Sequence, residues 1–82
     1  MEQPSTFALS LSDLKNNERG RIRLCRAGGL MKQKLISMGL IPGVEVTVLR
    51  SAPLLDPIEI SVQNYQVALR RNEALLVEVD KI

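Results

Sequence analysis

The sequence predicts a mainly β fold, a small five-stranded and partly open barrel with one α-helix after the first strand. Apolar residues alternate with polar ones in five short segments, whereas only residues 30–38 have apolar residues at helical spacing. The chain has 82 residues, which suffices for one domain with a thin core. Because a sheet this small protects its edges only by closing or nearly closing, a barrel is favoured.

The N-terminal part of the chain contains a tail and then the first strand. Residues 1–8 are expected to form a loose tail, and residues 9–82 a single domain. Charged and apolar residues alternate over residues 21–26, which predicts a half-buried strand. Ile22 and Leu24 are expected to share one face of this strand.

The predicted helix ends in a corner that two glycines shape. From Met31, apolar residues recur at i, i+4 and i+7, as on the buried face of a helix. Gly39 follows at the position that usually adopts a left-handed conformation, so Leu40 can pack back on the helix. Pro42 and Gly43 then fit the two central positions of a type II turn. We therefore interpret both glycines as structural turn residues with positive φ.

Four segments follow the corner as strands, with one polar link between the last two. The strands are expected at residues 44–48, 58–62, 65–69 and 75–79, and the link at 70–73 allows one helical turn. The expected inward residues before the link are Val44, Val46, Val48, Ile58, Ile60, Val62, Tyr65, Val67 and Leu69. Five strands and one helix fit an SH3-like barrel, with an OB-like barrel as the alternative.

Composition excludes most catalytic sites. The chain has one cysteine, Cys25, and no histidine, so it lacks a Cys-His pair, a Ser-His-Asp triad and zinc-ligand spacing. We therefore expect no enzyme, no cofactor and no metal site. The single cysteine, the absence of a long apolar run and the absence of a basic start to the N-terminus favour a cytoplasmic location.

Three motifs occur in series. Residues 35–46 read Leu-Ile-Ser-Met-Gly-Leu-Ile-Pro-Gly-Val-Glu-Val, residues 52–60 read Ala-Pro-Leu-Leu-Asp-Pro-Ile-Glu-Ile, and residues 68–74 read Ala-Leu-Arg-Arg-Asn-Glu-Ala. This series resembles the FeoA family, over a span from about Leu11 to Val79. A similar domain occurs at the C-terminus of iron- and manganese-dependent repressors.

The resemblance implies a fold and a partner. It implies an SH3-like barrel and a non-enzymatic accessory of bacterial ferrous iron uptake, which binds the cytoplasmic, GTPase-bearing region of the FeoB transporter. Contact with the membrane would then be indirect, through the transporter. The chain departs from the family at Asn17 and Leu55, where many members have glycine. Asn17 tolerates positive φ better than most residues, whereas Leu55 adds apolar surface.

The candidate partner-binding surface centres on the proline-flanked loop, residues 51–57. Its two prolines fix φ, and since Leu54 and Leu55 are adjacent, at least one of them is expected to be exposed. Alternatively, Leu54 plugs the end of the barrel. The charged side chains of the link at residues 70–73 are expected to face water; alternatively, its two arginines meet an acidic partner or phosphates. The candidate partner-binding residues are Leu40, Pro42, Pro53, Leu54, Leu55, Asp56, Pro57, Arg70 and Arg71.

Two alternative functions remain open at this point. Positive charge gathers around the first strand and the helix, which is a feature of nucleic-acid-binding modules. However, Phe7 and Tyr65 are the only aromatic residues, so base stacking and proline-peptide binding both lack their platforms, and we expect no nucleic acid partner. A metal sensor would depend on Cys25 and carboxylates, and no spacing among them specifies a site.

Overall fold

The computed structural model describes residues 9–52 and 54–82, and in these residues six antiparallel strands form one sheet. The order across the sheet is β1-β6-β2-β3-β4-β5, so β1 and β5 are its edges and the sheet does not close. The elements are β1 (Leu9–Ser10), η2 (Leu11–Asp13), β2 (Arg19–Cys25), α1 (Gly29–Ser37), β3 (Glu45–Arg50), β4 (Ile58–Val62), β5 (Tyr65–Leu69), α2 (Arg71–Ala74) and β6 (Val77–Lys81).

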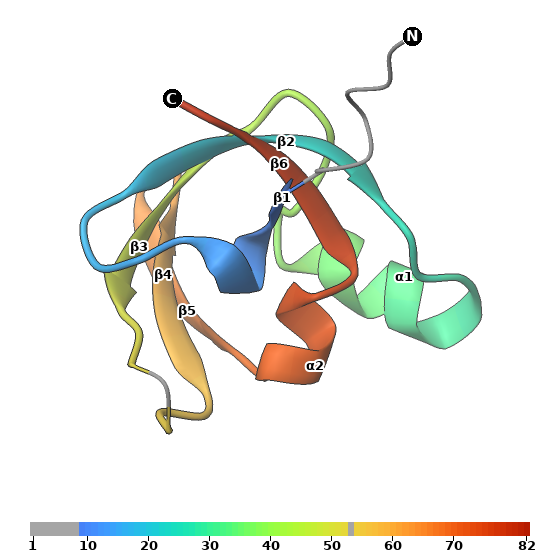
Figure 1. Cartoon of the computed structure of the whole chain (residues 1–82). Coiled ribbons are helices and arrows are strands. Elements are labelled where there is room, and N and C mark those ends of the chain that lie inside the picture. Colours follow the sequence, from blue (N-terminus) through green and yellow to red (C-terminus); the bar gives the residue numbers. More distant parts are fainter. Residues whose placement is uncertain (1–8, 53) are drawn as a thin grey trace, which may run out of the picture.

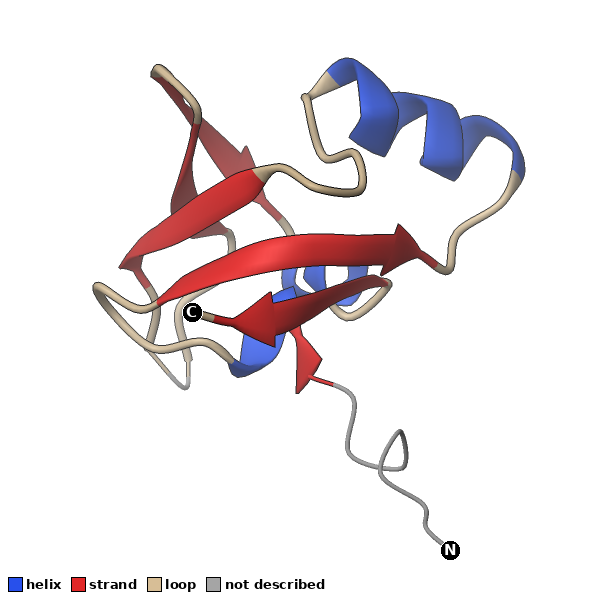
Figure 2. Cartoon of the chain, turned by 90° about the horizontal axis from the view of Figure 1, so that it is seen from above, coloured by secondary structure: helices blue, strands red, loops and turns tan. Residues whose placement is uncertain are grey.

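The predicted mainly β, partly open architecture is confirmed. The sheet curves around a core, and the short helices η2 and α2 lie within that curve (Figure 1). Figure 2 shows α1 to one side of the sheet, joined to it by loops at both ends. The expectation of five strands missed β1, a two-residue strand that pairs with β6. The expected tail, residues 1–8, lies outside the described residues.

The core forms from the inward residues of the strands, from single residues of η2, α1 and α2, and from two leucines in the connecting segments. In β3 and β4, the residues that the alternation places inward are almost completely buried, as expected. Val44, which precedes β3, is only partly buried. The buried apolar residues are Leu11, Leu14, Ile22, Leu35, Leu40, Val46, Val48, Ile58, Ile60, Val62, Leu69, Ala74, Val77 and Val79. Met31 and Met38 are partly buried and pack on this core, which confirms the predicted helix face.

The corner after α1 has the predicted geometry. The N–H of Leu40 donates to the carbonyl of Leu35 at 3.1 Å, and that of Gly39 to Ile36 at 2.9 Å, the two bonds of a Schellman ending. The φ angles of Gly39 and Gly43 are +90° and +93°. The N–H of residue 44 bonds to the carbonyl of residue 41 at 3.2 Å, which closes the type II turn.

Two expectations about side-chain direction were wrong, and the last strand begins later than the expected residue 75. Ile22 is buried but Leu24 is 41% exposed, because the register between β2 and β6 shifts between them. Such a bulge reverses the faces of the residues that follow it. Tyr65 is 44% exposed, since its hydroxyl reaches out to donate to the carbonyl of Met38 at 2.8 Å. Leu75 is exposed, and β6 begins two residues after it.

Candidate functional site

The proline-flanked loop joins β3 to β4 and presents one leucine to solvent. Leu54 is 99% exposed, whereas Leu55 is partly buried. The expectation that at least one of the two is exposed is confirmed, and the alternative in which Leu54 plugs the barrel is wrong. Asp56 is exposed and precedes Pro57 through a cis peptide bond, and Pro53 lies outside the described residues.

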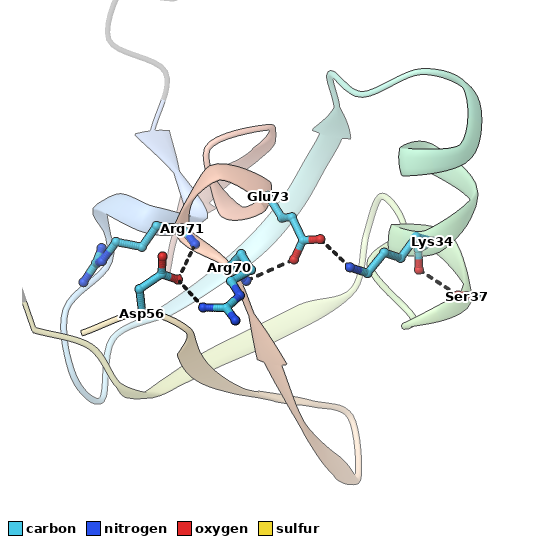
Figure 3. A network of polar contacts seen from close by, with 6 residues as sticks. All are labelled: Lys34, Ser37, Asp56, Arg70, Arg71 and Glu73. Carbon is cyan, nitrogen blue, oxygen red and sulfur yellow. Dashed lines mark hydrogen bonds and ion pairs between the residues drawn. The ribbon is translucent and has the colours of Figure 1, made fainter. Parts of the chain in front are cut away.

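Arg71 of α2 holds this loop in place. Its Nε donates to the carbonyl of Leu55 at 2.7 Å, and its Nη2 donates to the Ser51 hydroxyl at 3.1 Å and to the carbonyl of Ala52. Its backbone N–H donates to Oδ1 of Asp56 at 3.0 Å (Figure 3). A guanidinium suits this role because its donors form a rigid planar fork. Arg71 therefore fixes four positions of the loop from a single side chain and its backbone.

α2 is itself fixed by Glu73, which was expected to face water but is buried. Oε1 of Glu73 accepts a hydrogen bond from the backbone N–H of Arg70 at 3.0 Å, as in a capping box. Its other oxygen accepts from Nζ of Lys34 on α1 (Figure 3). The pKa of Glu73 lies below its usual value, mainly because Lys34 donates a hydrogen bond to the carboxylate. Burial alone would raise this pKa, but its effect is smaller. The pair thus ties α1 to α2.

Arg70 and Arg71 have different surroundings. Arg70 is exposed, and its Nη1 lies 4.0 Å from Oδ1 of Asp56, which is a weak surface ion pair. Arg71 is partly buried against the loop. The expectation that both side chains face water is therefore correct for Arg70 and wrong for Arg71.

The corner residues do not join this loop in one surface. The loop follows the C-terminal end of β3, whereas Leu40 and Pro42 precede the N-terminal end of this strand, whose six residues span about 17 Å. Figure 1 shows the two at opposite ends of β3. Leu40 is fully buried because the Schellman ending turns it into the core, so its side chain is not available to a partner. Pro42 is exposed.

A hollow opens beside the loop. It is lined by the end of η2 and the residues that follow it, by the first residues of the loop and by Arg71. The lining residues are Ser12, Asp13, Leu14, Lys15, Asn16, Ser51, Ala52 and Arg71. Oδ1 of Asn16 accepts from the N–H of Ser51 at 2.6 Å, which joins the two walls. No sequence motif indicated this hollow, because its walls come from three distant segments.

Most of the basic residues around β2 and α1 form ion pairs. Arg19 and Arg21 pair with Glu45, Arg23 lies near Asp80, and Arg26 pairs with the buried Glu78. Lys34 pairs with Glu73 as described above. Of the six basic residues in this region, Lys32 alone has no ion pair within the described part of the chain. A nucleic acid would find few uncompensated charges there.

Two further features bear on function. Within residues 9–52 and 54–82, no three His, Cys, Asp or Glu side chains lie close enough to hold a metal ion. Cys25 is partly buried and packs against the core. In the same residues, no helix has the length and apolar character that crossing a bilayer requires.

The curved sheet, the single helix inserted after β2 and the one-turn helix before β6 define a small domain of the SH3-like class. The chain belongs to the FeoA domain family, which matches residues 9–81. A curated relative in Porphyromonas gingivalis is an Fe(2+) transport protein A/Fe(2+) transporter FeoB fusion protein, 32% identical over 74 residues. That match covers 90% of this chain and 9% of the fusion protein, so the chain spans less than a tenth of that relative.

Solved structures agree with this family. A crystal structure of the iron uptake regulatory protein FeoA is 36% identical, with a TM-score of 0.86 over 93% of this chain and all of that one. FeoA of Stenotrophomonas maltophilia, described with zinc as a procaryotic SH3 domain protein, is 27% identical, with a TM-score of 0.80 over 89% of this chain and 91% of that one. A manganese-dependent transcriptional repressor shares the fold, at 18% identity and a TM-score of 0.84, over 98% of this chain and 38% of its own length. The predicted SH3-like fold and family resemblance are confirmed.

Proposed function

We propose that this chain is a cytoplasmic accessory protein of ferrous iron uptake that binds the cytoplasmic, GTPase-bearing region of a FeoB-type transporter. It acts by binding and without catalysis of its own, and it meets the membrane only through the transporter. The fusion relative supports this partner, because it joins an iron transport protein A and a FeoB transporter in one chain. Two domains fused in one organism are natural partners when they are separate chains in another.

The observation that carries the proposal is the fully exposed Leu54 on a loop that is held rigid. Leu54 has 99% of its surface in water, so its transfer into an apolar pocket on a partner would be favourable. The Arg71 hydrogen bonds and the fixed φ of Pro57 restrict the loop before binding. Binding through such a loop therefore loses little conformational entropy.

A pull-down with the transporter's soluble cytoplasmic domain, with and without a GTP analogue, tests this proposal. We expect the wild-type protein to be retained and Leu54→Glu to bind at least about 10-fold more weakly, since a buried anchor residue contributes 1.4 kcal/mol or more. Leu30→Glu is the matched control, because Leu30 is also highly exposed, at 82%, but lies at the start of α1. Equal retention of all three proteins would contradict the proposed contact.

A further inference from the structure

The hollow beside the proline-flanked loop carries an excess of positive charge. Lys15 and Arg71 line it, and Asp13 is the single carboxylate among its lining residues. Asp13 is already engaged, because its Oδ2 accepts from the N–H and the hydroxyl of Ser10 at 2.9 and 3.2 Å. Within the described residues, neither Lys15 Nζ nor the Arg71 guanidinium has a carboxylate within 4.0 Å. The carboxylate of Glu18, whose Oε1 accepts from the Lys15 N–H at 2.7 Å, forms its ion pair with Lys81.

Arg71 has donors left for a ligand. Its Nε and Nη2 bond to loop oxygens, whereas Nη1 has no hydrogen-bond partner among residues 9–52 and 54–82. Ser12, Asn16 and Ser51 line the same space. The Ser12 hydroxyl bonds to that of Ser10 at 2.7 Å, the Ser51 hydroxyl accepts from Arg71, and Oδ1 of Asn16 accepts from the N–H of Ser51. An oxyanion is the ligand that a guanidinium edge, an ammonium group and hydroxyls bind best.

We propose that this hollow is a subsite for a carboxylate side chain in an acidic segment of the protein partner. The proposal rests on the proposed function, since it places the carboxylate beside the partner pocket that takes Leu54. Ser51 and Ala52 belong to both the loop and the wall of the hollow, so a partner that covers the loop tip also covers the hollow. The apolar contact supplies buried area, and the ion pair sets the orientation of the two proteins.

The subsite can be tested without the transporter, by NMR titration of the whole chain. The probes are a peptide of four glutamates with blocked ends and, separately, inorganic phosphate. We expect the peptide to shift the Arg71 Nε–H and the amides of Asn16 and Ser51 saturably, with the Lys32 amide unmoved. The shifts should be lost in Lys15→Gln. Shifts spread evenly over Lys15 and Lys32, or a response to phosphate and none to the peptide, would overturn the carboxylate assignment.

Affinity for the transporter's cytoplasmic domain provides the second test. Lys15→Glu should weaken binding about 10-fold, because an interfacial charge pair is replaced by repulsion. Lys32→Glu, which changes the net charge equally at an exposed site on α1, should change binding less than threefold. If Lys15→Glu and Lys32→Glu weaken binding equally, the net charge of the protein and not the hollow controls the affinity, and the subsite is refuted. If the wild-type protein fails to bind this domain, the proposed function fails, and the peptide titration still decides whether the hollow is a carboxylate subsite.

Discussion

Replacement of Gly39 by alanine is expected to destabilise the fold strongly, for two separate reasons. At φ +90° a residue with a Cβ is strained by about 1–2 kcal/mol. The new Cβ would also overlap the hydroxyl of Tyr65 and lie 3.2 Å from Cγ1 of Val62. Displacement of Tyr65 breaks its hydrogen bond to Met38, worth about 0.5–1.5 kcal/mol. Together these terms predict a loss of about 1.5–3.5 kcal/mol in the free energy of unfolding.

Gly43 is the matched control for this variant. Its φ of +93° predicts the same strain, but nothing lies within 4 Å of an added Cβ, so Gly43→Ala should cost only about 1–2 kcal/mol. In a domain of this size about 1 kcal/mol corresponds to about 4–8 °C in Tm. Thermal unfolding followed by circular dichroism should therefore give a clearly lower Tm for Gly39→Ala than for Gly43→Ala.

A double-mutant cycle with Tyr65→Phe separates steric overlap from strain. In the wild-type background this change removes the hydrogen bond to Met38 and should cost about 1 kcal/mol. In the Gly39→Ala background it also removes the overlapping hydroxyl, so it should cost nothing or stabilise the fold. If Tyr65→Phe costs the same in both backgrounds, and the two alanine variants melt together, the overlap does not exist.

Three further predictions concern the polar contacts around α2. Glu73→Gln should lower the free energy of unfolding at pH 7 by about 1–3 kcal/mol. Because folding lowers the pKa of Glu73 below its ordinary value of 4.5, its stabilisation is complete above pH 4.5 and is lost as the pH falls through the folded-state pKa. The difference between wild type and Glu73→Gln in urea unfolding should therefore shrink between pH 7 and pH 3, and a constant difference would contradict this. Arg71→Ser should speed hydrogen exchange at the Leu55 amide, which bonds to the carbonyl of Ala52, because the loop loses its guanidinium. Unchanged exchange would show that Arg71 does not hold the loop. Arg70→Ser should change the free energy of unfolding by less than about 0.5 kcal/mol in the same urea assay, and a larger loss would contradict its assignment as a surface residue.

The parts of the fold that depend on neighbouring residues were predictable. The Schellman ending and the type II turn at Gly39 and Gly43 follow from residues within six positions of each other, and the alternation over β3 and β4 directly marks their buried face. The positive φ of Asn17, +71°, also matches its turn residue type. Each of these features is therefore determined by residues that are close to it in the sequence.

The features that the sequence did not reveal depend on distant contacts. β1 exists only because two residues near the start of the domain pair with the last strand. The bulge after Ile22 leaves no residue-type signal, since both strands keep ordinary strand residues. Arg71 and Ala52 are nineteen positions apart, so no local pattern indicates that this arginine holds the loop. Glu73 accepts from the N–H of Arg70 as the N3 residue of a capping box does, but arginine is not one of the N-cap residues that mark this motif, so the sequence did not signal the burial of Glu73.

Cellular uptake of radioactive ferrous iron is the measurement that tests the central claim most directly. The assay compares cells that lack the native protein and carry wild type, Leu54→Glu or Leu30→Glu, with equal protein levels confirmed by immunoblot. Because Leu54 is the exposed point of the rigid loop, Leu54→Glu should reduce uptake to the level of cells without the protein. Leu30→Glu should restore uptake as wild type does. Normal uptake with a folded, equally abundant Leu54→Glu protein would remove this loop from the function.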